Sequence, residues 1–213
     1  MLLDRFKEKT TFIMTFLLNL QMVIEKIEKL QGEGKKALEN IINSNYQLNL
    51  LKNTNDFLFK NVDNLVSFTL NRENEWNMIV SKEILIKISE LYDSFEKNFK
   101  FLYENFLYIG TGKQIKEEIS IEEIARELFV DLEGRKEVRK VFLLMKLIAN
   151  SWGISKDFQK DLVLKREIIK MFENPEKKLD ELKYCLELWV YCPFINEKLF
   201  EEFSSNLKFF SKI

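Results

Sequence analysis

Residues 84–109 read ILIKISELYDSFEKNFKFLYENFLYI, and this stretch decides the fold class. Its large apolar side chains recur mainly at spacings of three and four residues, which places them on one face of an α-helix. The recurring positions are Ile84, Ile88, Leu91, Phe95, Phe99, Leu102, Phe106 and Ile109. Glu96 lies four residues before Lys100, an order that favours an exposed helical ion pair. We therefore predict a long helix from about Trp76 to Ile109.

Two earlier stretches carry the same kind of apolar pattern. The first runs from Phe6 to Leu30, and Gly32 and Gly34 predict its end. The second runs from about Lys35 to Asn71, and two asparagines interrupt its apolar stripe. These are Asn45 and Asn55. Because the connections between the three stretches are short, we predict a long, coiled-coil-like, antiparallel three-helix bundle over residues 1–112.

Residues 113–213 show shorter helical patterns separated by turn residues. A Ser-x-x-Glu capping box predicts one helix start, and glycines and prolines predict the later boundaries. These boundaries are at Ser120, Gly134, Gly153, Pro175 and Pro193. We predict a smaller, compact domain of about five helices, and a chain that is all-α throughout.

The composition supports a folded helical protein and disfavours catalysis. Only 6 glycines and 2 prolines are present, fewer than the regular turns of a β-sandwich or barrel require. The chain has no histidine, which removes the most common general base and metal ligand. We therefore expect no enzyme activity, no metal and no cofactor.

The charge pattern gives little support to nucleic-acid binding. The chain has 33 basic and 34 acidic residues, and neither predicted half has a basic excess. The segment Ile121–Ala125 resembles the opening of helix-turn-helix domains, but Phe129 stands where that family has its turn glycine. A nucleic-acid-binding regulator nevertheless stays the alternative function. The basic residues that it would use are Arg135, Lys136, Arg139 and Lys140.

The apolar segment Phe12–Ile24 is shorter than the roughly 20 residues that a membrane-spanning helix needs. Cys185 and Cys192 lie seven residues apart on one predicted helix, so about 10 Å separates their Cα atoms. This separation is too long for a disulfide, and we predict that both are small apolar core residues. We expect a cytoplasmic protein without a membrane span.

No constellation of side chains in the sequence indicates a reaction. We therefore predict a non-catalytic helical protein–protein interaction module, that is, an adaptor, a regulator or an inhibitor. Its partner would be another protein or a second copy of itself. An asparagine in a helical seam can fix register and partner choice, although it can also mark a partly solvated face. The predicted contact residues are Asn45, Asn55, Phe209 and Phe210.

Overall fold

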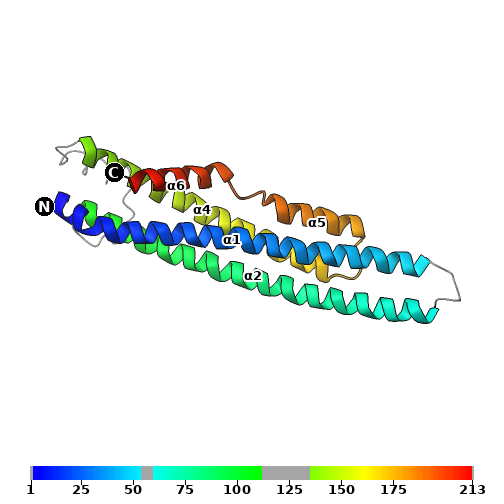
Figure 1. Ribbon diagram of the computed structural model, residues 1–213. Coiled ribbons are helices and arrows are strands. Elements are labelled where there is room, and N and C mark those ends of the chain that lie inside the picture. Colours follow the sequence, from blue (N-terminus) through cyan, green and yellow to red (C-terminus); the bar gives the residue numbers. More distant parts are fainter. Residues whose placement is uncertain (1, 54–59, 112–134, 213) are drawn as a thin grey trace. The chain divides into compact units, whose positions relative to one another are not determined.

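The structure is a computed structural model that describes residues 2–53, 60–111 and 135–212, with side chains described over 13–51, 64–104 and 139–212. Within these ranges it contains five helices and no strand, so the all-α prediction is confirmed. The helices, labelled in Figure 1, are α1 (Leu2–Asn53), α2 (Lys60–Thr111), α4 (Arg135–Glu173), α5 (Leu179–Tyr191) and α6 (Glu197–Phe210).

Over residues 2–53 and 60–111 the structure has two long helices where the sequence predicts three. Helix α1 continues through Gly32 and Gly34, and α2 continues through the polar run that begins at Asn71. An interior glycine costs only about 1 kcal/mol relative to alanine, which helix packing readily offsets. Gly34 in fact serves packing, because a Cβ built on it would collide with the indole ring of Trp189.

Helix α4 likewise runs unbroken through Gly153, where the sequence predicts a boundary. A Cβ on Gly153 would lie 2.6 Å from Cδ2 of Leu199, so this glycine also allows a close approach between two helices. The predicted helix end at Asn174-Pro175 is confirmed, because α4 ends at Glu173. Pro175 itself lies in the turn before α5 rather than in its first turn.

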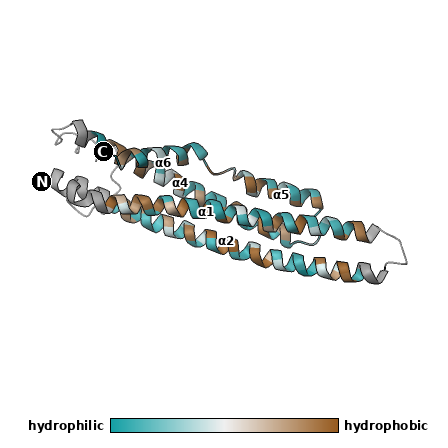
Figure 2. Cartoon of the chain, in the orientation of Figure 1, coloured by the Kyte–Doolittle hydropathy of each residue, from teal (hydrophilic) through white to brown (hydrophobic). Residues whose placement is uncertain are grey.

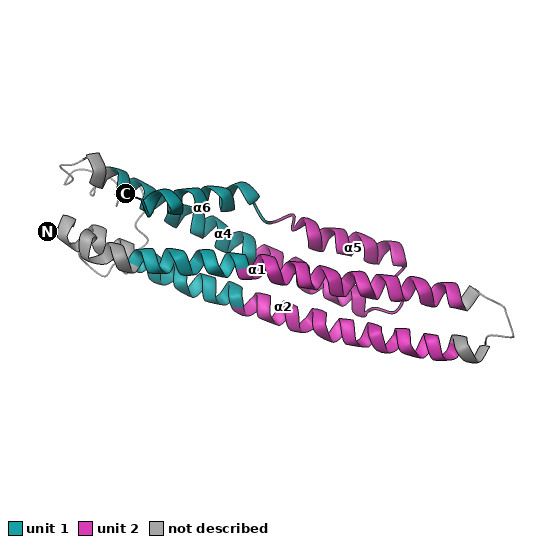
Figure 3. Cartoon of the chain, in the orientation of Figure 1, with its two compact units in different colours: residues 1–25, 91–158, 195–213 teal, residues 26–90, 159–194 magenta. Residues whose placement is uncertain are grey.

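The chain divides into two compact units, coloured separately in Figure 3. Unit 1 comprises Met1–Glu25, Leu91–Phe158 and Ile195–Ile213, and unit 2 comprises Lys26–Glu90 and Gln159–Phe194. Both units therefore take segments of α1, α2 and α4, and unit 1 adds α6 while unit 2 adds α5. The predicted domain boundary between residues 112 and 113 lies outside the described residues and stays a prediction.

The core of unit 1 is built around the ring of Phe158 on α4. This ring stacks on Tyr92 at 4.3 Å between centroids and meets Phe95 edge to face at 5.1 Å. From α6, Phe200 approaches the same ring at 5.8 Å. These geometries are the ones that aromatic pairs prefer, and they tie α2, α4 and α6 together.

In unit 2, α1 and α2 pair in opposite directions. Asn45 on α1 contacts Asn74 on α2, and Asn40 on α1 contacts Asn77 on α2. The residue numbers of the contacting positions therefore rise along one helix as they fall along the other. This shows the antiparallel part of the predicted bundle for α1 and α2. Buried residues that match the predicted stripes of these helices include Leu38, Ile41, Ile84 and Ile88.

Both cysteines are buried and free of disulfides, as the sequence predicts. Burial raises the pKa of the Cys185 thiol above its ordinary value. Among the described helices, none is both long and apolar enough to cross a membrane. Figure 2 shows hydrophilic residues interspersed along each labelled helix.

Candidate interaction surface

Within unit 2, helix α2 carries apolar side chains on two opposite faces. One face is buried in the core and includes Leu70, Ile84 and Ile88. The other face points away from that core and carries five large apolar side chains, which we call the outer stripe. The outer stripe comprises Leu65 (67% exposed), Phe68 (63%), Trp76 (65%), Ile79 (49%) and Ile86 (58%).

The outer stripe follows a heptad-like period when Arg72 and Glu83, both exposed, are included. The seven positions are then spaced by three, four, four, three, four and three residues, which averages 3.5 residues per step. At 3.6 residues per turn they fall within an arc of about 80°, and they extend over about 32 Å. A period of 3.5 is the one by which two helices wind around each other in a left-handed coiled coil.

The two charged positions of this face have opposite signs and lie toward opposite ends of the outer stripe. Arg72 comes one turn after Phe68, with its guanidinium carbon 5.9 Å from the Phe68 ring centroid. Glu83 comes one turn after Ile79, and Glu90 then follows on the same face as an exposed acid. The apolar surface therefore ends after Ile86, where the next residue on this face is the charged Glu90.

A cleft of about 1020 Å³ adjoins the outer stripe, because Ile79 belongs to both. It lies between α1, α2 and the α4–α5 turn, all within unit 2. Neutral carboxamides make up much of its polar lining. These are Asn45, Asn49, Asn71, Asn74 and Asn174.

Asn74 has a buried side-chain oxygen in this polar lining. Its Nδ2 donates a hydrogen bond of 2.8 Å to Oδ1 of Asn45, while its own Oδ1 is buried without a hydrogen-bond partner. A buried acceptor that lacks a donor costs free energy unless a water or a ligand supplies one. At the cleft's rim, the Lys82 ammonium is already paired with Glu173.

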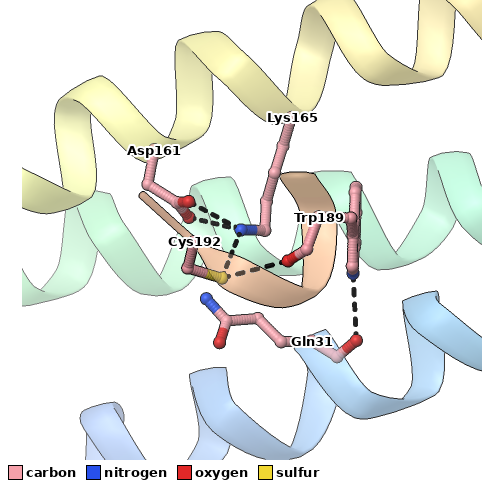
Figure 4. Close-up of polar contacts among 5 residues, drawn as sticks. All are labelled: Gln31, Asp161, Lys165, Trp189 and Cys192. Carbon is pink, nitrogen blue, oxygen red and sulfur yellow. Dashed lines mark hydrogen bonds and ion pairs between the residues drawn. The ribbon is translucent and has the colours of Figure 1, made fainter. Parts of the chain in front are cut away.

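A buried ionic cluster holds α4 and α5 together in unit 2 (Figure 4). The Lys165 ammonium and the Asp161 carboxylate have no exposed side-chain surface, and Nζ lies 2.7 Å from both carboxylate oxygens. Nζ also donates to Sγ of Cys192 at 3.3 Å and lies 5.1 Å from the Trp189 ring centroid. All three ammonium donors are therefore satisfied.

The same cluster reaches α1 through Trp189. Its Nε1 donates a hydrogen bond of 3.0 Å to the carbonyl oxygen of Gln31. Gln31 lies about one helical turn before Gly34, the glycine against which the indole ring packs. Cys192 ends α5 with a left-handed φ of 42°, and its Sγ donates to the Trp189 carbonyl at 3.1 Å. Because Lys165 and Asp161 are completely enclosed, we interpret the cluster as a structural element of the core.

Three of the four predicted contact residues have described side chains, and their role in partner binding stays a prediction. Asn45 is half-buried and bonded to Asn74 within the same chain, and Asn55 lies outside the described residues. Phe210 is buried in unit 1, with 5% of its surface exposed. Phe209 is 39% exposed, but the Arg139 guanidinium carbon lies 4.5 Å from its ring centroid.

The predicted basic patch is only partly described. Arg135 and Lys136 belong to α4, but their side chains lie outside the described ranges. Arg139 engages Phe209, and Lys140 is half-buried. Nucleic-acid binding through these residues stays a prediction.

Sequence reasoning missed the outer stripe because it treated residues 35–71 and 76–109 as separate helices. Leu65 falls within the earlier of these two predicted helices, whereas in the structure it lies on α2 and is largely exposed. The signal was nevertheless present. Trp76, Ile79 and Ile86 keep helical spacing with Leu65 and Phe68 once the two segments are joined.

The chain matches no protein-family model, no curated protein and no solved structure. Among the residues that the structure describes, no group of three or more cysteine, aspartate or glutamate side chains could hold a metal ion. We therefore infer the function from the geometry of this chain alone.

Proposed function

We propose that this protein is a non-catalytic interaction module and that the outer stripe of α2 is its contact surface. One observation carries the proposal: five large apolar side chains are half to two-thirds exposed on one face of a helix whose opposite face is in the core. Isolated exposed apolar residues are ordinary, but a contiguous apolar surface usually marks a contact site.

The chemistry of this surface also fits a protein interface. Aromatic residues and arginine are enriched in the centres of interfaces, and this face of α2 supplies Phe68 and Trp76 from the outer stripe and Arg72 between them. The carboxamides of the adjoining cleft would form a neutral polar rim, able to donate and accept hydrogen bonds.

Photocrosslinking from defined positions of the outer stripe tests the proposal and needs no candidate partner. A benzophenone amino acid is placed at Trp76, and in a second chain at Ile86, and each full-length chain is expressed in its native host and irradiated. The matched control position is Tyr184, which is 62% exposed on α5 of the same unit.

We expect discrete protein adducts from positions 76 and 86, and none of the same mass from position 184. Adding Phe68→Glu to the position-76 chain should strongly reduce the adduct, because a carboxylate within the apolar surface would be desolvated by any partner. The absence of stripe-specific protein adducts, or equal adducts from position 184, would contradict the proposal. Circular dichroism checks that each chain keeps its helical content.

A further inference from the structure

We infer that the partner bound to the outer stripe is a second copy of this chain. The two α2 helices run antiparallel, and a two-fold axis relates them. This axis lies on the side of the outer stripe, at the level of Asn77 and Met78 along the helix. The inference rests on the proposed function, because it uses the same surface. It adds the identity of the partner, its direction and its register.

The two charged residues on the same face of α2, Arg72 and Glu83, select this arrangement. A two-fold axis between residues 77 and 78 places each position opposite the one that lies equally far on the other side. Arg72 then faces Glu83 of the second copy, and Glu83 faces Arg72. Arg72 and Glu83 are thereby paired with opposite charges by one symmetry operation, as a self-complementary interface requires, while Glu90 lies opposite Leu65 at the end of the contact.

The same operation pairs the two central apolar side chains of the outer stripe. Trp76 lies opposite Ile79 of the second copy, on both sides of the axis, which places two aromatic–aliphatic contacts at the centre. Ile86 comes opposite Thr69, beside Phe68 of the second copy. The centre of the interface is therefore apolar and the ionic pairs flank it, an arrangement typical of stable interfaces.

A parallel arrangement in register has the opposite electrostatic character. It would place Arg72 against Arg72 and Glu83 against Glu83, so both ionic layers would repel. The antiparallel arrangement has neither repulsion. The outer stripe also spans 22 residues, which corresponds to the three heptads that two helices need to form a recognisable coiled coil.

Sedimentation velocity of the purified full-length chain tests the association and its charge pairing. We expect a dimer that dissociates on dilution. Arg72→Glu alone and Glu83→Arg alone should each weaken it by on the order of tenfold, because two attractive pairs become repulsive. An equimolar mixture of these two variants should form a heterodimer of about wild-type affinity, since every pair is again of opposite charge.

The double variant Arg72→Glu/Glu83→Arg should likewise form a homodimer of about wild-type affinity. Glu73→Arg is the matched control, because Glu73 is an exposed acid on α2 outside the outer stripe, and it should leave the dimer unchanged. A parallel dimer predicts a different pattern, in which neither single variant weakens association and the mixture exceeds the wild type.

Disulfide trapping tests the direction of the two helices. Leu65 is the first residue of the outer stripe and Glu90 follows its last residue on the same face, and the two-fold axis places Leu65 and Glu90 opposite each other. A Leu65→Cys chain mixed with a Glu90→Cys chain should give a covalent heterodimer under mild oxidation. The Leu65→Cys chain alone should not, because its two thiols would be about 37 Å apart along the axis. The native cysteines are buried in both chains.

Three results would overturn the inference: a wild-type chain that stays monomeric at all concentrations, loss of association in the charge-swapped mixture, or trapping of Leu65→Cys with itself. These results are distinguishable from failure of the proposed function. Adducts from positions 76 and 86 to a different protein, together with a monomeric chain, would leave the interaction module intact and exclude the second copy as its partner.

Discussion

Unit 1 and unit 2 are built from segments of the same three long helices, but they bury different kinds of side chain. In unit 1 the core around Phe158 consists of stacked and edge-to-face aromatic rings. In unit 2 the core contains a fully buried ammonium–carboxylate pair. A part-buried Asn45–Asn74 carboxamide pair, which lines the cleft, also joins α1 and α2 in this unit.

The two kinds of core constrain the fold in different ways. Apolar contacts are non-directional, so an aromatic core fixes how tightly helices pack more than which positions meet. The Lys165–Asp161 pair lies within α4, so a shift of α5 would not separate the two charges, but it would remove the hydrogen bond from the enclosed Lys165 ammonium to Sγ of Cys192. We propose that unit 2 uses directional contacts to hold α1, α2 and α5 in one register, and so presents the outer stripe in a fixed position.

The largest expected effect compares Lys165→Met in unit 2 with Phe158→Ala in unit 1. Lys165→Met leaves the buried Asp161 carboxylate without its ammonium and should lower the free energy of unfolding by ~3–5 kcal/mol. Phe158→Ala leaves a cavity and should cost a similar ~3–5 kcal/mol. Urea unfolding followed by circular dichroism measures both.

A second substitution separates the two cases. Asp161→Leu combined with Lys165→Met removes both charges, so it should restore stability to near or above wild type, as apolar replacements of buried ion pairs often do. If the double variant were no more stable than Lys165→Met alone, the loss would come from packing against Trp189 rather than from the orphaned carboxylate. Hydrogen exchange in α5 and α6 then reports which unit has opened in each variant.

The glycines of α1 give a smaller, internally controlled comparison. Gly34→Ala should destabilise the protein by about 1–3 kcal/mol, because the new Cβ displaces the Trp189 indole and disturbs its hydrogen bond to Gln31. Gly32 has nothing within 4 Å of a built Cβ, so Gly32→Ala should stabilise the helix by about 0.5–1 kcal/mol. Thermal unfolding of the two variants should shift in opposite directions. A shift in the same direction would mean that Trp189 does not restrict position 34.

These glycines also show how far the sequence alone could predict the fold. The helical class and many core positions followed from apolar spacing, and Phe95, Phe99 and Leu102 are buried as predicted. The helix boundaries at Gly34 and Gly153 were wrong. A glycine that ends a helix and one that admits a neighbouring side chain look alike until the neighbour is known, and Trp189 lies 155 residues from Gly34.

The candidate site was less predictable than the fold, for a related reason. The sequence marked Asn45 as an unusual seam residue, but only the structure shows that Asn74 is its partner, on the next helix. Apolar spacing identifies a helical face without saying whether that face meets the core. Leu65 and Ile84 both follow helical spacing, and one is exposed while the other is buried. Tertiary contacts alone distinguish them.

The smallest expected effect concerns the start of α5, which lines the cleft of unit 2. The Lys178 backbone N–H donates a 2.9 Å hydrogen bond to Oε2 of Glu181. This bond, with help from the Lys177 ammonium, lowers the pKa of the Glu181 carboxyl below its ordinary value of 4.5. Because the folded pKa is below the unfolded one, the stabilisation is present at neutral pH and is lost as pH falls through the folded value.

An NMR titration of the Glu181 side-chain carboxyl carbon should therefore show a midpoint below pH 4.5, with the Lys178 amide shift following the same curve. Glu181→Gln should abolish this titration of the Lys178 amide and only slightly weaken helix capping, because a glutamine carbonyl still accepts the bond. If the Lys178 amide titrated unchanged in Glu181→Gln, the carboxylate would not be the acceptor. The α5 start would then be held by its buried residues, Leu182, Cys185 and Trp189, and not by local charge.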